Sequence, residues 1–153
     1  MALADLLQQD AIIPALKVNS KKQLLQELAA KASRITGVPE REVFDVILQR
    51  ERLGSTGVGH GIAIPHGKLE SISSIVGVFA RLESPVDFEA LDDQPVDLVF
   101  LLLAPEGAGA DHLKALSRIA RVLRDQDLVA KLRATDSDTA IYAFLNQEQA
   151  NAA

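Results

Sequence analysis

Three residues of this sequence combine reactive or charged side chains with unusual positions: Arg50, His66 and His112. His66 directly follows a proline and the short apolar segment 62–64. Proline fixes the backbone leading into the histidine, and a ring held in this way can present one nitrogen as a nucleophile while the other is hydrogen-bonded. We therefore expect His66 to be a candidate nucleophile at the end of a short buried strand. An ordinary histidine in a surface turn is the alternative.

Arg50 falls on the apolar side of a helix that the sequence predicts from Pro39 to about Leu53. At about 100° per residue, it lies in register with Val43 and Ile47. An arginine that faces inward needs an anion, because an unpaired buried charge is costly. An arginine that extends past the helix end and caps its carbonyls is the other interpretation. The apolar arc of this helix comprises Val43, Phe44, Val46, Ile47, Leu48 and Leu53.

His112 shares the apolar stripe of a second helix, predicted over about 110–124, with Leu116, Ile119 and Leu123. It stands in the first turn, where the helix dipole disfavours an imidazolium. A neutral ring there can donate from one nitrogen and accept at the other, although a histidine satisfied at the edge of a core is the alternative. Together with Arg50, it predicts a cleft with a cation and a neutral donor facing inward.

A glycine-rich segment over residues 54–61, with four glycines in eight residues, precedes the apolar segment that leads to His66. Such a segment lets backbone N–H groups converge and a ligand approach closely. It completes neither a P-loop nor a dinucleotide-binding fingerprint. A tight turn explains the glycines equally well.

The remaining pattern predicts the elements that position these residues. Ser20 and Gln23 form a capping box at the start of a helix that ends at Gly37. Strands are predicted over 74–82 and 96–104, separated by Pro85 and a polar turn, and a last helix over about 138–145. Interleaved helices and strands predict an α/β fold, a single-domain sandwich with a mixed β-sheet flanked by helices on both faces. We expect this domain over residues 1–146, followed by a flexible C-terminal tail over 147–153.

Composition excludes several classes of function. The net charge is −5, no basic block stands out and aromatic residues are 4%, so we expect no nucleic-acid partner. Cysteine is absent, which excludes disulfides and thiolate metal sites. No apolar run approaches the roughly 20 residues of a membrane span, and the N-terminus lacks the features of a signal peptide. We expect a cytoplasmic protein without membrane insertion.

The segment from Arg50 to Lys68, RERLGSTGVGHGIAIPHGK, closely resembles the phosphorylation-site signature of enzyme IIA proteins of the mannitol/fructose class of the bacterial phosphotransferase system. Its leading RERLGSTGVG and its ending GIAIPHGK look most like the nitrogen-regulatory subgroup. The resemblance extends over essentially the whole chain, including the segment 112–117 in the late helix.

This resemblance implies a role for each candidate. His66 would be the phosphoryl acceptor through Nε2, Arg50 would contact the phosphoryl oxygens, and His112 would be the second active-site histidine. It implies no metal and no cofactor. His60 departs from the asparagine or acid more usual at its position, and its charge change near neutral pH would make phosphorylation or docking pH-sensitive unless it lies on the rim. The residues expected to support the site are Ser55, Thr56, Gly57, Gly59, His60 and Gly61.

The resemblance also implies partners. The donor would be a histidine-phosphorylated carrier of the HPr type, and the phosphorylation state would regulate target proteins, among which the family includes potassium transporters and sensor kinases. A sugar-specific component that passes phosphate to a IIB domain is the nearest alternative. A metal-dependent hydrolase that uses His60, His66 and His112 as zinc ligands, and a binding module whose His66 is never phosphorylated, are the others.

Overall fold

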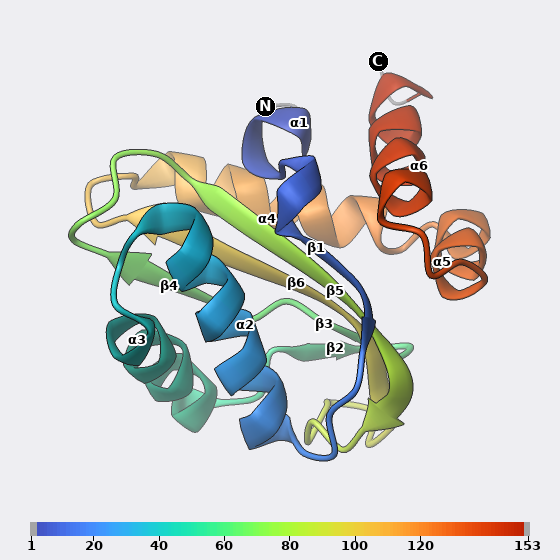
Figure 1. Cartoon of the computed structure of the whole chain (residues 1–153), viewed down its shortest axis with the longest axis horizontal. Coiled ribbons are helices and arrows are strands. Elements are labelled where there is room, and N and C mark those ends of the chain that lie inside the picture. The colour runs from blue at the N-terminus through green and yellow to red at the C-terminus, as the bar shows by residue number, and fades with distance from the viewer. Residues whose placement is uncertain (1–2, 152–153) are drawn as a thin grey trace.

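A computed structural model, which describes residues 3–151, shows a six-stranded sheet between two layers of helices (Figure 1). The strands are β1 (Ile12–Leu16), β2 (Gly57–Gly59), β3 (Ile62–Ala63), β4 (His66–Leu69), β5 (Val76–Val86) and β6 (Val96–Pro105). The helices are α1 (Leu3–Leu6), the 3-10 helix η1 (Gln9–Ala11), α2 (Lys21–Thr36), α3 (Glu40–Leu53), α4 (Ala110–Val122), α5 (Gln126–Arg133) and α6 (Asp138–Asn151). None of the described helices is long and apolar enough to cross a membrane.

The sheet is mixed, as predicted. Its order is β1-β5-β6-β3-β2, and β4 also pairs with β6. β1 is parallel to β5, and β3 and β4 are parallel to β6, whereas β5 is antiparallel to β6 and β2 to β3. The predicted α/β sandwich is therefore confirmed.

Strands β3 and β4 are two parts of one line of pairing along β6. Ile62 lies opposite Leu98, and His66 lies opposite Leu102 in the same register. Pro65 falls between the two parts; it has no N–H for the ladder, although its carbonyl accepts from the Leu102 N–H at 2.9 Å. The prediction that His66 ends a strand is therefore wrong, because pairing resumes after the proline and His66 begins β4.

Two hydrophobic cores lie on opposite faces of the sheet. One is shared with α2 and α3, and the other with α1, α4, α5 and α6. Successive side chains of β6 alternate between them: Val99 and Leu101 join the first core, whereas Leu98 and Phe100 join the second. This double coverage explains the continuous apolar run of β6.

Local signals set the ends of α2 as expected. The Ser20 hydroxyl accepts from the backbone N–H of Gln23 at 3.1 Å, and the Gln23 side chain accepts from the Asn19 N–H at 2.7 Å. Gly37 ends the helix in the left-handed conformation, with φ of 79°.

Three elements differ from the prediction. β5 runs through Pro85, at a point where the β5–β6 register is interrupted between Arg81 and Val86 and the missing N–H costs no ladder bond. The helix α5 was not predicted. α6 continues to Asn151, so residues 147–151 of the expected tail are helical, and 152–153 lie outside the described residues. The domain boundary at 146 stays a prediction.

Candidate active site

His66 lies at an edge of the sheet, between the ends of two helices. β4 pairs with β6, and β6 pairs with β5 on its other side. Arg50 comes from the last turn of α3, and His112 comes from the first turn of α4. The helix α3 packs closely on β4, because a Cβ on Gly67 would lie 2.4 Å from Val46 Cγ1 and 3.9 Å from the backbone carbonyl carbon of Val46. The sheet edge and the two helices thus bring the three predicted residues together.

The ring of His66 is held through both nitrogens. Its Nδ1 lies 2.9 Å from the Ile64 carbonyl oxygen, and its Nε2 accepts a hydrogen bond from Arg50 Nε at 3.2 Å. A guanidinium can only donate, so Nε2 carries the lone pair and Nδ1 carries the proton. This is the tautomer in which Nε2 is the nucleophilic atom.

Arg50 also caps the chain that leaves α3. Its Nη1 donates to the Gly54 carbonyl at 2.8 Å, and the side chain is half-buried. The capping interpretation of Arg50 is therefore confirmed, and the same guanidinium contacts His66; its contact with an anion stays a prediction. The prediction for Leu53 is wrong: it is 85% exposed, since the last turn of α3 borders an open depression instead of the core.

His112 is buried beside His66. The two rings have centroids 5.7 Å apart and an interplanar angle of 69°. Burial lowers the pKa of His112, and repulsion from the His66 ring when it is protonated, and then from Lys68, lowers it further. Its Nε2 is buried and has no hydrogen-bond partner within the described part of the chain. An unpaired buried nitrogen is costly, so its presence next to a candidate nucleophile indicates a role toward a ligand.

These residues surround a shallow depression of about 540 Å³. Leu53 lines it with a largely exposed apolar side chain, and Leu113, the residue after His112 on α4, is 68% exposed. The lining residues are Val46, Gln49, Arg50, Arg52, Leu53, His66, Gly67, Lys68 and His112. Three cations and no carboxylate line it, so the depression suits an anion.

None of the expected supporting residues lines this depression. Ser55 donates to the Phe88 carbonyl at 2.9 Å and accepts from the Gly57 N–H at 3.1 Å. The N–H of Thr56 donates to Glu51 Oε1 at 3.1 Å. These loop N–H groups are already paired, so their contacts build the loop and support no direct role toward His66.

Glu51 is a buried carboxylate that sequence reasoning missed. It accepts from both the N–H and the hydroxyl of Thr56, and it pairs with Lys21 Nζ at 3.0 Å. Lys21 also lies 4.5 Å from the centre of the Phe88 ring. The available signal was its position, since Glu51 follows Val43 and Ile47 at intervals of four and shares their buried stripe. Glu51 fixes the loop that leaves α3 immediately after Arg50.

The glycines and His60 form a tight turn away from His66. Gly59, His60 and Gly61 have φ of 105°, 58° and 81°, in the left-handed region that favours glycine, and glycine occupies two of these three positions. A Cβ on Gly57 would lie 2.7 Å from the Cβ of Ala90. His60 lines a different groove, and no group of three metal-ligating side chains occurs among residues 3–151. The three histidines therefore do not form the zinc site of the hydrolase alternative.

Comparison with known proteins identifies the family that shares this arrangement. The family model described as "Phosphoenolpyruvate-dependent sugar phosphotransferase system, EIIA 2" matches residues 5–148. The chain belongs to this family. Its EIIA-type members are phosphotransferase components, which agrees with a candidate nucleophile, His66, in a depression lined by cations.

Within the EIIA 2 family, the chain is similar to nitrogen-regulatory members. It is 66% identical, over the full length of both chains, to a nitrogen regulatory protein of Bradyrhizobium diazoefficiens. It matches the crystal structure of the nitrogen regulatory protein IIA-Ntr from Neisseria meningitidis with a TM-score of 0.89 and 36% identity, over 94% of this chain and 98% of that one. A fructose-specific EIIA component of Haloferax volcanii is 40% identical, over 86% of this chain and 84% of that protein. The EIIA-type phosphocarrier and regulatory role is thus supported above the sugar-specific one.

Proposed function

We propose that the chain accepts a phosphoryl group on Nε2 of His66 from a histidine-phosphorylated carrier of the HPr type. The observation that carries this proposal is the pair of contacts on the His66 ring, Arg50 to Nε2 and Ile64 to Nδ1. They hold a neutral ring in the nucleophilic tautomer and place a fixed cation at the reacting atom.

The transfer needs no general base. The lone pair of His66 Nε2 forms the new N–P bond while the N–P bond to the donor imidazole breaks, and the electron pair of that bond stays on the donor ring. The proton on Nδ1 remains in place, where the Ile64 carbonyl stabilises the charge that develops on the ring. The protein therefore contributes position and charge stabilisation.

Arg50 and His112 supply that stabilisation. Arg50 Nε must exchange Nε2 for a phosphoryl oxygen as the group arrives, while its bond to the Gly54 carbonyl keeps the guanidinium in place. His112 is held neutral by burial, and its unpaired Nε2 is available as a hydrogen-bond donor. Two donors of different charge thus face the site at which the equatorial oxygens will lie.

The rim of the depression fits a protein donor. Leu53, which lines the depression, and Leu113, which follows His112 on α4, expose large apolar side chains. Exposed apolar residues around a reactive group are typical of a docking surface for another protein. We infer that the carrier buries these leucines as its phosphohistidine approaches His66.

We further infer that the phosphorylation state of His66 is read by target proteins in the cytoplasm, as expected for a nitrogen-regulatory member. Potassium transport proteins and sensor kinases are the target classes that this interpretation favours. Transfer onward to a sugar-specific IIB domain is the second candidate, and the similarity to a fructose-specific EIIA component supports it.

Incubation with phosphoenolpyruvate, enzyme I and an HPr-type carrier tests the proposal, with intact mass as the readout. We expect a gain of about 80 Da, one phosphoryl group, that is lost in acid and kept in base, as is typical of an N-phosphohistidine. The His66→Ala variant should show no gain, whereas the His60→Asn variant should show the full gain. No gain with either nitrogen-branch or sugar-branch carriers would contradict the proposal.

A further inference from the structure

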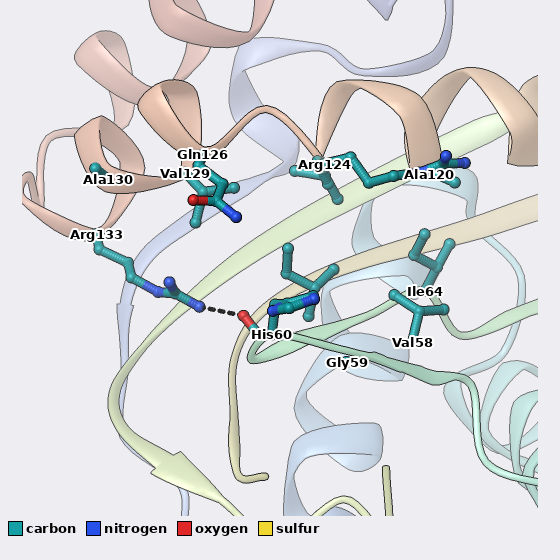
Figure 2. A pocket seen from close by; sticks show the side chains of 12 residues that line it. Val58, Gly59, His60, Ile64, Ala120, Arg124, Gln126, Val129, Ala130 and Arg133 are labelled. Carbon is teal, nitrogen blue, oxygen red and sulfur yellow. Dashed lines mark hydrogen bonds between the residues drawn. The ribbon is translucent and has the colours of Figure 1, made fainter. Parts of the chain in front are cut away.

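A second and larger groove lies on the α4 side of the sheet, away from the depression around His66. One wall is the turn between β2 and β3, and the other is formed by the end of α4 and by α5 (Figure 2). Its volume is about 1010 Å³. It shares no lining residue with the His66 depression, so the proposed phosphoryl transfer does not account for it.

The groove has an apolar floor. Ile62 and Ile64 come from the β2–β3 side, and Leu123 and Val129 come from the helical side. Val58 adds an exposed apolar side chain at the edge, with 51% of its surface accessible. A floor of this kind fits the apolar part of a ligand, which removes it from water.

The polar side chains around this floor are cationic or neutral. They are His60, Arg124, Gln126 and Arg133, and no carboxylate belongs to the lining. The backbone N–H of Arg124 donates to the Arg121 carbonyl, but its side chain has no hydrogen bond or ion pair with any part of the chain that the structure describes, which leaves its whole guanidinium for a ligand. Arg133 binds Asp97 through Nε and Nη2, and its Nη1 contacts no partner among residues 3–151.

The cationic end of the groove is rigidly built. Arg133 Nη2 donates to the His60 carbonyl at 2.7 Å, as Figure 2 shows, while the His60 N–H donates to Asp92 at 3.0 Å. A Cβ on Gly61 would lie 2.4 Å from Arg133 Nη2, so only glycine leaves room for this contact. The turn and α5 are therefore fixed to each other around His60 before any ligand binds, which lowers the entropic cost of binding.

We propose that this groove binds a small organic anion, with an apolar body on the isoleucine floor and a carboxylate or phosphate head group against Arg124 and Arg133. The volume lies at the upper end of the roughly 300–1,000 Å³ range of small-molecule sites. The two arginines suit either head group, because both accept paired hydrogen bonds from a guanidinium.

Titration of the whole protein with 8-anilinonaphthalene-1-sulfonate, an anion with an apolar body, tests this proposal through its fluorescence. We expect saturable 1:1 binding that weakens about tenfold in Arg124→Gln, the effect of losing a charge-assisted hydrogen bond. The control Arg121→Gln, an exposed arginine of α4 outside the groove, should bind as wild type does. The neutral analogue N-phenyl-1-naphthylamine should bind more weakly than the sulfonate and should not distinguish the two variants.

Two further arms locate the site and identify the head group. Binding should be unchanged in His66→Ala and lost in Ala130→Trp, which fills the groove from an exposed position of α5. 1-Naphthoate and 1-naphthyl phosphate should both displace the probe, and the stronger competitor identifies the preferred head group. The proposal would be overturned by equal binding of the probe to wild type and Arg124→Gln, by loss of binding in His66→Ala, or by failure of both competitors to displace the probe. Failure of both competitors would favour a protein as the partner of this groove.

Discussion

Arg50 Nε and His66 Nε2, sixteen residues apart in the chain, lie 3.2 Å apart and form a hydrogen bond. The bond joins the last turn of α3 to the first residue of β4. Because arginine only donates, the contact keeps the proton off Nε2 and leaves it on Nδ1 beside the Ile64 carbonyl. A single side chain thus selects the tautomer of His66 and supplies a cation for the incoming group.

The Arg50→Ala variant should transfer phosphate more slowly. Losing one preorganised charge donor raises the activation free energy by about 2–4 kcal/mol, so we expect the transfer rate to fall by about 30- to 1,000-fold. Single-turnover kinetics with a phosphorylated carrier measures this rate. Arg41→Ala removes an exposed cation from the first turn of the same helix and should leave the rate unchanged. An Arg50→Ala rate within twofold of wild type would show that Arg50 has no role in transfer.

His112 should titrate below 6.5, the pKa of an unperturbed histidine, because burial, a protonated His66 ring and Lys68 each disfavour its imidazolium. Phosphorylation of His66 should raise the pKa of His112, since a nearby anion favours the protonated ring. Nitrogen-detected NMR titration of the free and the phosphorylated protein measures both values. A pKa of His112 that does not change on phosphorylation would place its ring away from the phosphoryl group.

The same low pKa makes stability depend on pH. Below pH 6.5 the unfolded chain protonates residue 112 before the folded protein does, so the unfolded state gains protons and the free energy of unfolding decreases as the pH falls. Above pH 6.5 the ring is neutral in both states and contributes no slope. Urea unfolding across this range should show a shallower decrease for His112→Gln than for wild type.

Glutamate at the exposed leucines should weaken docking and spare the fold. Leu53→Glu and Leu113→Glu place charge on the surface that we expect the carrier to bury, so KM for the phosphorylated carrier should increase by about tenfold or more. Leu91→Glu is the matched control, because Leu91 is 81% exposed and, unlike Leu53 and Leu113, neither lines the depression nor adjoins a residue that does. Equal KM values for all three variants would show that the carrier does not bind over Leu53 and Leu113.

Glu51→Ala should destabilise the protein. The substitution leaves the Thr56 N–H without its partner in a buried position and removes the ion pair with Lys21, and one such unsatisfied donor costs about 1–3 kcal/mol. Glu42→Ala, at an exposed acid in the same helix, should change the free energy of unfolding by less than about 0.5 kcal/mol. Chemical denaturation measures both. An unchanged free energy for Glu51→Ala would mean that water replaces the carboxylate.

Much of the fold could be predicted because its signals are local. The capping box at Ser20, the left-handed Gly37 and the apolar run of β6 each depend on neighbouring residues. The short helix α5 was missed although Asp125 caps it by accepting from the N–H groups of Asp127 and Leu128. A helix of eight residues is marginal on its own in water, so the packing of Leu128, Val129 and Leu132 into the second core decides its conformation.

The residues of the candidate site could also be predicted only where their signal was local. Arg50 and His112 stood out because a polar residue on an apolar stripe conflicts with its local pattern. Glu51 lies on the same stripe and was missed, since its partners Lys21 and Thr56 come from an earlier helix and from the loop. Whether a loop residue faces His66 depends on tertiary contacts. Helical spacing therefore could not show that Arg50 contacts His66 whereas Ser55 and Thr56 only build the loop.

Identifying the nitrogen that carries the phosphoryl group shows directly whether Nε2 of His66 is the acceptor. Long-range proton–nitrogen NMR of the phosphorylated protein distinguishes Nε2 from Nδ1 in each of the three histidines. We expect the group on Nε2 of His66, with the proton retained on Nδ1 opposite the Ile64 carbonyl. Phosphate on Nδ1 of His66, or on His60 or His112, would contradict the account.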